Sequence, residues 1–169
     1  MKYKFLLIIF SSLFYTCSSD DDSKDQEINT LSDSIIQEIL DAHNSYRNDV
    51  NIPDIVWSEE VAKSAQLWAD DLATNCEFKH SGGEYGENIW VGSTKVFTPT
   101  DVVTSWGSEI SDYDYESNTC TTDKDCGHYT QIVWKNSTTV GCGTATCDGV
   151  DIWVCQYDPP GNFIGQKPY

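Results

Sequence analysis

Histidines and glutamates are the residues of this chain best suited to chemistry at neutral pH. The sequence holds three histidines, His43, His80 and His128. A neutral imidazole binds divalent metals, and a carboxylate that accepts a hydrogen bond from the second ring nitrogen holds the ring in place. Glu87 lies in a glycine-rich stretch beside an apolar run, and Glu109 falls three residues after Trp106. That spacing places Glu109 on the inward face of a predicted helix.

An inward glutamate needs a partner, because an unpaired buried charge is costly. Lysine and arginine are scarce, with 10 residues against 27 aspartates and glutamates, so histidine is a good candidate for that partner. A site built from His80, Glu87, Glu109 and His128 is therefore chemically sensible, with zinc or another divalent cation as its cofactor. Composition alone does not show that these four side chains lie close together in the fold.

The chain has 169 residues and a formal net charge of -17. This length predicts one domain that is large enough to bury a core of its own. The acidic surface would repel a phosphate backbone, so nucleic acid is not expected as a partner. The six tryptophans and nine tyrosines are read mainly as core.

The sequence has seven cysteines, and their pattern helps to indicate whether the protein is exported or stays in the cytosol. Cys17 stands alone, and the other six lie between Cys76 and Cys155, without the paired Cys-x-x-Cys steps of a zinc finger. Six cysteines in an exported domain predict three disulfides. They allow 15 pairings, among which the sequence alone does not choose. Cys120 with Cys126 is plausible as a short ring, and Cys142 with Cys155 as a bridge between two strands.

The N-terminus predicts export. Residues 1–16 combine early lysines with an apolar run that is too short to span a bilayer, as in a signal peptide. Cys17 and the acidic run after it resemble the lipidated cysteine and tether of Bacteroidetes lipoproteins. We therefore expect a lipidated Cys17, a flexible tether over residues 17–31 and a domain over residues 32–169. The expected location is the outer membrane or cell surface, with membrane contact through the lipid only; simple secretion is the alternative.

Helical periodicity and caps predict helices that start near Ser32, at Ser58 and near Thr98. The third should bury Ile110 together with Trp106. Residues 79–97 are read as a loop because of their glycines. Residues 140–146 and 152–157 read as strands of a hairpin that turns at Asp148-Gly149. Helices followed by a hairpin indicate an α+β fold.

Four segments resemble motifs of the cysteine-rich secretory protein (CAP) superfamily, in its order and spacing. They are His43–Arg47, Gly86–Ile89, Gly127–Trp134 and Cys155–Phe163. The resemblance covers residues 35–169, and from Tyr113 onward the chain is similar to the plant pathogenesis-related class 1 branch.

This resemblance implies a three-layer α/β/α sandwich with a mostly antiparallel central sheet. It also implies a solvent-facing cleft whose tetrad of two histidines and two glutamates is His80, Glu87, Glu109 and His128. His43, Asn44 and Arg47 are expected to form a buried structural motif instead. The implied disulfides are Cys76–Cys147, Cys120–Cys126 and Cys142–Cys155.

Three functions remain open at this point. The favoured one is a monomeric, non-enzymatic binding module for a lipid, sterol, cell-wall or protein ligand. The second is a hydrolase, which would use a metal-activated water or a serine such as Ser81 beside His80. The third is a structural or adhesive surface protein. Neither motif nor charge separates the first two.

Overall fold

The computed structural model describes residues 31–169. The predicted signal peptide, the lipidation at Cys17 and the tether up to residue 30 lie outside these residues. Within residues 31–169, no helix combines the length and the apolar character needed to cross a membrane.

Helices and strands alternate up to residue 107; a 3₁₀ helix, two short strands and a short helix follow, and a long hairpin comes last. The helices are α1 (Asp33–Asp49), α2 (Glu59–Asn75), α3 (Pro99–Gly107), the 3₁₀ helix η1 (Ser108–Asp112) and α4 (Gly127–Ile132). The strands are β1 (Val56–Trp57), β2 (Gly86–Ser93), β3 (Tyr113–Asp114), β4 (Thr119–Cys120), β5 (Thr139–Cys147) and β6 (Val150–Asp158).

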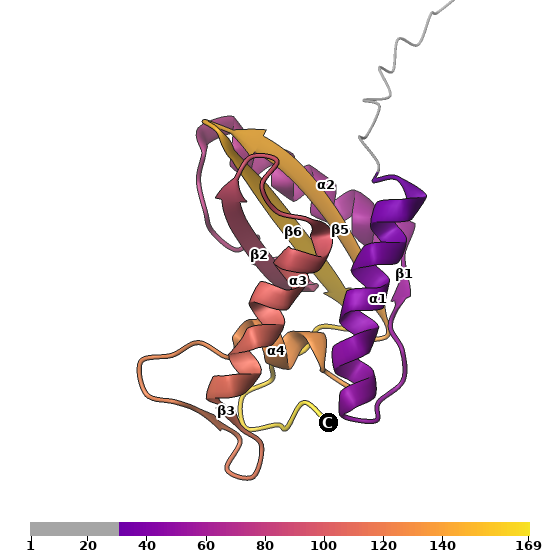
Figure 1. Ribbon diagram of the computed structural model, residues 1–169, viewed down its shortest axis with the longest axis vertical. Coiled ribbons are helices and arrows are strands. Elements are labelled where there is room, and N and C mark those ends of the chain that lie inside the picture. Colours follow the sequence, from indigo (N-terminus) through magenta and orange to yellow (C-terminus); the bar gives the residue numbers. More distant parts are fainter. Residues whose placement is uncertain (1–30) are drawn as a thin grey trace, which may run out of the picture.

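The four-stranded sheet has the order β1-β5-β6-β2, and helices cover both of its faces (Figure 1). The pairs β5–β6 and β2–β6 are antiparallel, whereas β1 runs parallel to β5. One core cluster joins the sheet to α1, α3 and α4, and a second joins it to α2. The predicted three-layer α/β/α sandwich with a mostly antiparallel sheet is confirmed.

The second helix begins, and the hairpin turns, at the residues that the sequence predicts. Ser58 caps α2, because its side chain accepts the backbone N–H of Val61. Asp148 and Gly149 connect β5 to β6 with φ angles of 46° and 83°, the left-handed pair of a tight hairpin turn. The structure pairs Cys76 with Cys147, Cys120 with Cys126 and Cys142 with Cys155, the same pairs that the resemblance implies.

The interpretation of residues 79–97 as a loop is wrong in its middle, over residues 86–93. Strand β2 lies there and pairs with β6 along its whole length, from Gly86 opposite Tyr157 to Ser93 opposite Val150. The glycines near its two ends suggested a loop, but Gly86 has a tertiary role. A Cβ on Gly86 would lie 2.3 Å from the end of the Gln131 side chain, so any larger residue would displace that buried amide from its place in α4.

The third helix ends earlier than expected. The α-helix stops at Gly107 and tightens into η1, so the phase of an unbroken helix does not extend to Ile110. Ile110 is 45% exposed, and its predicted burial is wrong. Glu109 nevertheless points inward from η1, and its side chain is only 17% exposed.

The motif His43–Arg47 forms a buried network between α1 and the other elements. His43 Nδ1 lies 2.8 Å from the carbonyl oxygen of Ile39, and His43 Nε2 lies 2.9 Å from the hydroxyl of Tyr157. The buried guanidinium of Arg47 donates to four carbonyl oxygens, those of Pro53, Ile132, Trp134 and Ser137, at 2.8 to 3.0 Å. The expected structural role of this motif agrees with these contacts.

Candidate functional site

His80 and Glu87 form the first pair of the predicted site. His80 Nδ1 lies 2.8 Å from Glu87 Oε1, which also accepts the backbone N–H of Ser81 at 2.9 Å. Glu87 Oε2 accepts the side-chain amide of Gln156 at 2.9 Å. The Glu87 side chain is only 5% exposed, whereas that of His80 is 63% exposed. A buried, fully bonded carboxylate thus orients a largely solvent-facing imidazole.

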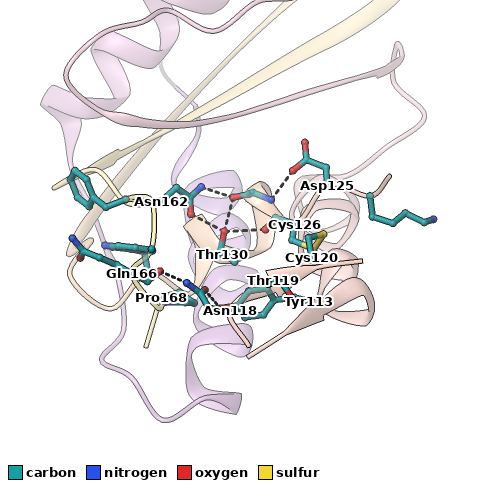
Figure 2. A pocket seen from close by; sticks show the side chains of 15 residues that line it. Tyr113, Asn118, Thr119, Cys120, Asp125, Cys126, Thr130, Asn162, Gln166 and Pro168 are labelled. Carbon is teal, nitrogen blue, oxygen red and sulfur yellow. Dashed lines mark hydrogen bonds between the residues drawn. A yellow bond between two sulfur atoms is a disulfide. The ribbon is translucent and has the colours of Figure 1, made fainter. Parts of the chain in front are cut away.

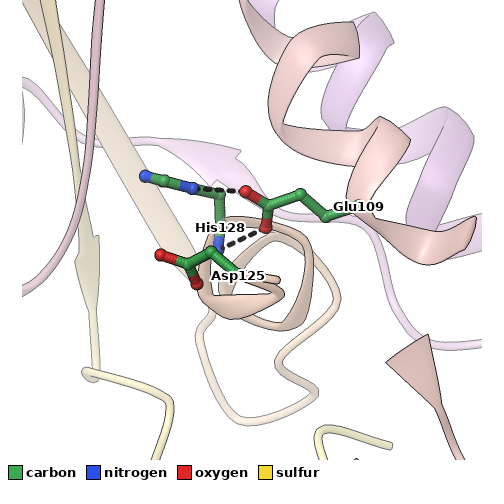
Figure 3. A group of neighbouring side chains, drawn as sticks. All are labelled: Glu109, Asp125 and His128. Carbon is green, nitrogen blue, oxygen red and sulfur yellow. Dashed lines mark hydrogen bonds and ion pairs between the residues drawn. The ribbon is translucent and has the colours of Figure 1, made fainter. Parts of the chain in front are cut away.

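His128 and Glu109 form the second pair, at the start of α4. His128 Nδ1 lies 2.6 Å from Glu109 Oε1 (Figure 3). Glu109 Oε2 accepts the backbone N–H groups of His128 and Tyr129, at 2.9 and 3.0 Å. The Trp106 ring stacks against the imidazole with ring centroids 6.2 Å apart. The second imidazole is therefore held by a carboxylate on one edge and an indole on one face.

Both pairs fix the same tautomer. A carboxylate only accepts hydrogen bonds, so Nδ1 carries the proton in the neutral form of each histidine. The lone pair of each ring is then on Nε2. Imidazole nitrogens oriented by carboxylates are the donor set that zinc and similar divalent cations prefer. Each imidazole is therefore of the kind that can bind a divalent metal through Nε2.

Edge strand β2 connects the two pairs. Glu87 belongs to the first pair, and the side-chain amide of its neighbour Asn88 donates to the carbonyl of His128 at 3.1 Å. Glu87 and Asn88 are neighbours on β2, so this strand links the first pair to the main chain of His128. That all four side chains converge in one cleft stays a prediction.

A third acidic residue accompanies the second pair. One ligand atom from each of Glu109, Asp125 and His128 lies within 4.8 Å of the other two. No other set of three potential metal ligands meets this limit within residues 31–169, and His80 and Glu87 are outside it. Sequence reasoning missed Asp125, although an acidic residue three positions before His128 at the start of α4 was a possible signal.

Two negative groups face the His128 imidazole. Burial lowers the pKa of His128, but the hydrogen bond to Glu109, the charge of Glu109 and the charge of Asp125 outweigh it, so the pKa is raised above its ordinary value. His128 therefore holds a proton more tightly than an isolated histidine, and a bound cation would replace that proton.

Ser81 does not form a nucleophile pair with its neighbour. Its hydroxyl accepts the backbone N–H of Gly83 at 3.2 Å, and His80 Nδ1 is bonded to Glu87. In the described part of the chain, no hydrogen bond joins Ser81 to His80. The contacts thus give the serine-hydrolase alternative no support.

A separate cavity of about 340 Å³ lies between the β3–β4 hairpin and the C-terminal tail (Figure 2). Its polar groups largely bond one another. Asn118 donates to the carbonyl of Gln166 at 3.1 Å, and Thr130 donates to Asn162 Oδ1 at 2.7 Å. These contacts fasten the tail to the domain, and we assign no ligand to this cavity.

Comparison with known proteins places the chain in a family. The profile described as "CAP: Cysteine-rich secretory protein family" matches residues 40–157, which include all four histidine–glutamate site residues. The chain belongs to this family. It is 46% identical over 134 residues to pathogenesis-related protein 1A of Nicotiana tabacum, a match that spans 79% of this chain and 80% of that protein.

Solved structures show the same fold. The crystal structure of NaASP2 with Zn²⁺ aligns with a TM-score of 0.67 and 27% identity, over 83% of this chain and 87% of that one. Na-ASP-1 aligns with a TM-score of 0.68 and 24% identity over 88% of this chain, which spans only 44% of the length of Na-ASP-1.

Proposed function

We propose that this protein is an exported binding module whose cleft holds a divalent cation on His80 and His128. The observation that carries the proposal is the matched geometry of the two histidines. Each donates from Nδ1 to a glutamate; Glu87 also accepts one backbone N–H group, and Glu109 accepts two. The crystal structure of NaASP2 with Zn²⁺, a protein 27% identical to this chain, supports zinc as the cation.

The bound cation would supply a positive charge that attracts a negative or polar group of a ligand. The chain's own residues orient the imidazoles: Glu87 and Glu109 through hydrogen bonds, and Trp106 through its stacking against His128. The ligand classes that we propose are a lipid, a sterol, a cell-wall component or a protein.

A binding and turnover experiment tests the module against its alternatives. Protein purified without chelator would be assayed for sterol and lipid-vesicle binding and for peptide hydrolysis. The wild type would be compared with His128→Ala and with Glu116→Gln, an exposed control. We expect binding that His128→Ala weakens at least tenfold and Glu116→Gln leaves unchanged, without turnover. Peptide turnover lost in His128→Ala would instead establish a hydrolase, and neither binding nor turnover would favour a structural or adhesive protein.

The proposed location is the outer membrane or cell surface, with the protein monomeric and anchored through lipid on Cys17. The family description names secretory proteins, which supports export. Mass spectrometry of the membrane fraction should find a modified N-terminal Cys17. Unlipidated protein found only in the medium would contradict the anchor and leave export intact.

A further inference from the structure

A groove of about 450 Å³ lies between α2 and the loop that precedes β2. Ser64, Leu67, Trp68 and Asp71 form its α2 wall, at helical spacings i, i+3, i+4 and i+7. Tyr85 contributes to the opposite wall, and Gln156 of β6 is at the floor. The groove contains neither His128 nor Glu109, so it is separate from the second histidine–glutamate pair.

The floor of the groove has an unused hydrogen-bond acceptor. Gln156 is 3% exposed, and its Nε2 donates to Glu87 Oε2 at 2.9 Å. If the amide were flipped, Gln156 Oε1 would face the Glu87 carboxylate, and two acceptors cannot form a hydrogen bond. Gln156 therefore keeps Nε2 toward Glu87. Oε1 has no hydrogen-bond partner among residues 31–169. A buried acceptor without a donor costs free energy, so a ligand N–H group that reaches this oxygen, which is itself shielded from solvent, gains from it.

The walls combine aromatic rings with negative charge. The Trp68 indole donates to the carbonyl of Lys79 at 3.2 Å, which fixes the orientation of the ring. Asp71 and Glu84 are exposed carboxylates on the two sides of the groove. The Lys79 ammonium is paired with Glu77 at 2.6 Å and also interacts with the charge of Asp71. The groove therefore offers acceptors and π faces, on a chain whose formal net charge is -17.

We propose that this groove binds the guanidinium group of an arginine-bearing peptide. A guanidinium is planar, carries five N–H donors and stacks on aromatic rings, so it uses the carboxylates, the Gln156 oxygen and Trp68 at once. An ammonium is a compact point charge and stacks less well. A neutral sugar would stack on Trp68 but would gain no charge attraction from Asp71 and Glu84. This proposal does not depend on a metal in the cleft.

The test is an NMR titration of the ¹⁵N-labelled protein with N-acetyl-arginine amide. The expected result is a saturable shift of the Trp68 indole N–H and the Gln156 side-chain amide. The double variant Asp71→Asn/Glu84→Gln should weaken binding at least fivefold. The matched control Asp112→Asn/Glu116→Gln removes the same charge elsewhere and should leave binding unchanged.

Three results would overturn the proposal. The first is equal weakening in the two double variants, which would mean general attraction to an acidic surface. The second is shifts spread over the backbone N–H signals of many exposed aspartates and glutamates. The third is a shift of the Trp68 and Gln156 signals by N-acetylglucosamine but not by the arginine amide, which would assign the groove to a neutral carbohydrate. Retained spectral dispersion in both variants shows that they are folded.

Discussion

The Glu109 carboxylate accepts two hydrogen bonds from the same residue, one from the imidazole Nδ1 of His128 at 2.6 Å and one from its backbone N–H at 2.9 Å. It thereby fixes both the main chain at the start of α4 and the ring that leaves it. Glu87 likewise accepts a hydrogen bond from the imidazole Nδ1 of His80, but the backbone N–H that it accepts belongs to the next residue, Ser81. The site consists of two such carboxylate–histidine units.

Glu109→Gln should lower the pKa of His128. The hydrogen bond to Glu109 and its negative charge raise that pKa against the effect of burial, and a neutral amide keeps at most the hydrogen bond. Asp125→Asn should lower it less, because Asp125 acts through charge alone. Imidazole carbon-bound proton shifts followed against pH measure both values. An unchanged pKa in Glu109→Gln would show that the pair does not exist in solution.

Acid should destabilise the protein through His43. Burial lowers the pKa of His43 from 6.5 to about 4, so the unfolded chain takes up a proton at a higher pH than the folded one. Above pH 6.5 the titration of His43 does not affect the free energy of unfolding. As the pH falls from 6.5 toward 4, this titration lowers the free energy of unfolding, in total by roughly 3 kcal/mol.

Urea unfolding at pH 7 and pH 4.5 measures this loss. We expect His43→Gln to be less stable than the wild type at pH 7 but to lose less stability on acidification, because its side chain does not titrate. An equal loss in both proteins would assign the acid sensitivity to other groups.

His80, Glu87, Glu109 and His128 were candidates because of their residue types and the family resemblance, but the sequence did not predict which glutamate contacts which histidine. It did not predict the strand that connects the two pairs either. Strand β2 was missed because its glycines suggested a loop. Gly86 instead packs against Gln131, which is 45 positions away in the chain, and no local sequence pattern shows such a contact.

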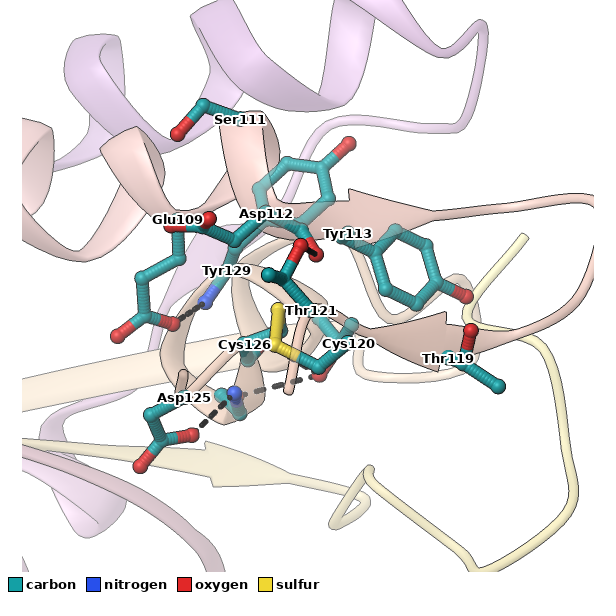
Figure 4. Close-up of a disulfide and its surroundings, with 12 residues drawn as sticks. Glu109, Ser111, Asp112, Tyr113, Thr119, Cys120, Thr121, Asp125, Cys126 and Tyr129 are labelled. Atoms are coloured by element: carbon teal, nitrogen blue, oxygen red, sulfur yellow. Dashed lines mark hydrogen bonds between the residues drawn. A yellow bond between two sulfur atoms is a disulfide. The ribbon is translucent and has the colours of Figure 1, made fainter. Parts of the chain in front are cut away.

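Asp125 was missed for a related reason. It lies in the loop that the Cys120–Cys126 disulfide closes between the last residue of β4 and the residue before α4, and its Oδ1 accepts the backbone N–H of Gly127 at 2.8 Å (Figure 4). The placement depends on a covalent link within an irregular loop. Helical or strand periodicity carries no information about such a loop.

Arg47→Lys should destabilise the domain by roughly 3 kcal/mol, since an ammonium on a flexible stem cannot serve four carbonyls and leaves buried acceptors unpaired. Arg47 is the only arginine of the sequence. Lys63→Arg, an exchange at an exposed position of α2, is the control and should change stability by less than about 0.5 kcal/mol. Chemical denaturation compares them; similar stability for Arg47→Lys and the wild type would refute the role of the guanidinium.

Gly141→Ala should destabilise the packing of α2 on the sheet. A Cβ at Gly141 would lie 2.0 Å from the backbone nitrogen of Ala62, and neither backbone can yield without moving the helix. Overpacking of this kind costs typically about 1 to 3 kcal/mol. At Gly83 the nearest atom is the Ser81 hydroxyl at 3.5 Å, so Gly83→Ala is the tolerated control. Thermal unfolding should show a lower Tm for Gly141→Ala only; equal Tm values would contradict the close approach.

The convergence of the two pairs can be measured directly by calorimetric titration of the metal-free protein with Zn²⁺. We predict one zinc per chain, with a similar large loss of affinity in His80→Ala and in His128→Ala, because both imidazoles bind the same ion. Glu77→Gln, an exposed glutamate paired with Lys79, should bind like the wild type. Zinc affinity that survives in either histidine variant, or imidazoles more than about 8 Å apart in a zinc-soaked crystal, would contradict the shared site, since zinc–nitrogen bonds are roughly 2 Å long.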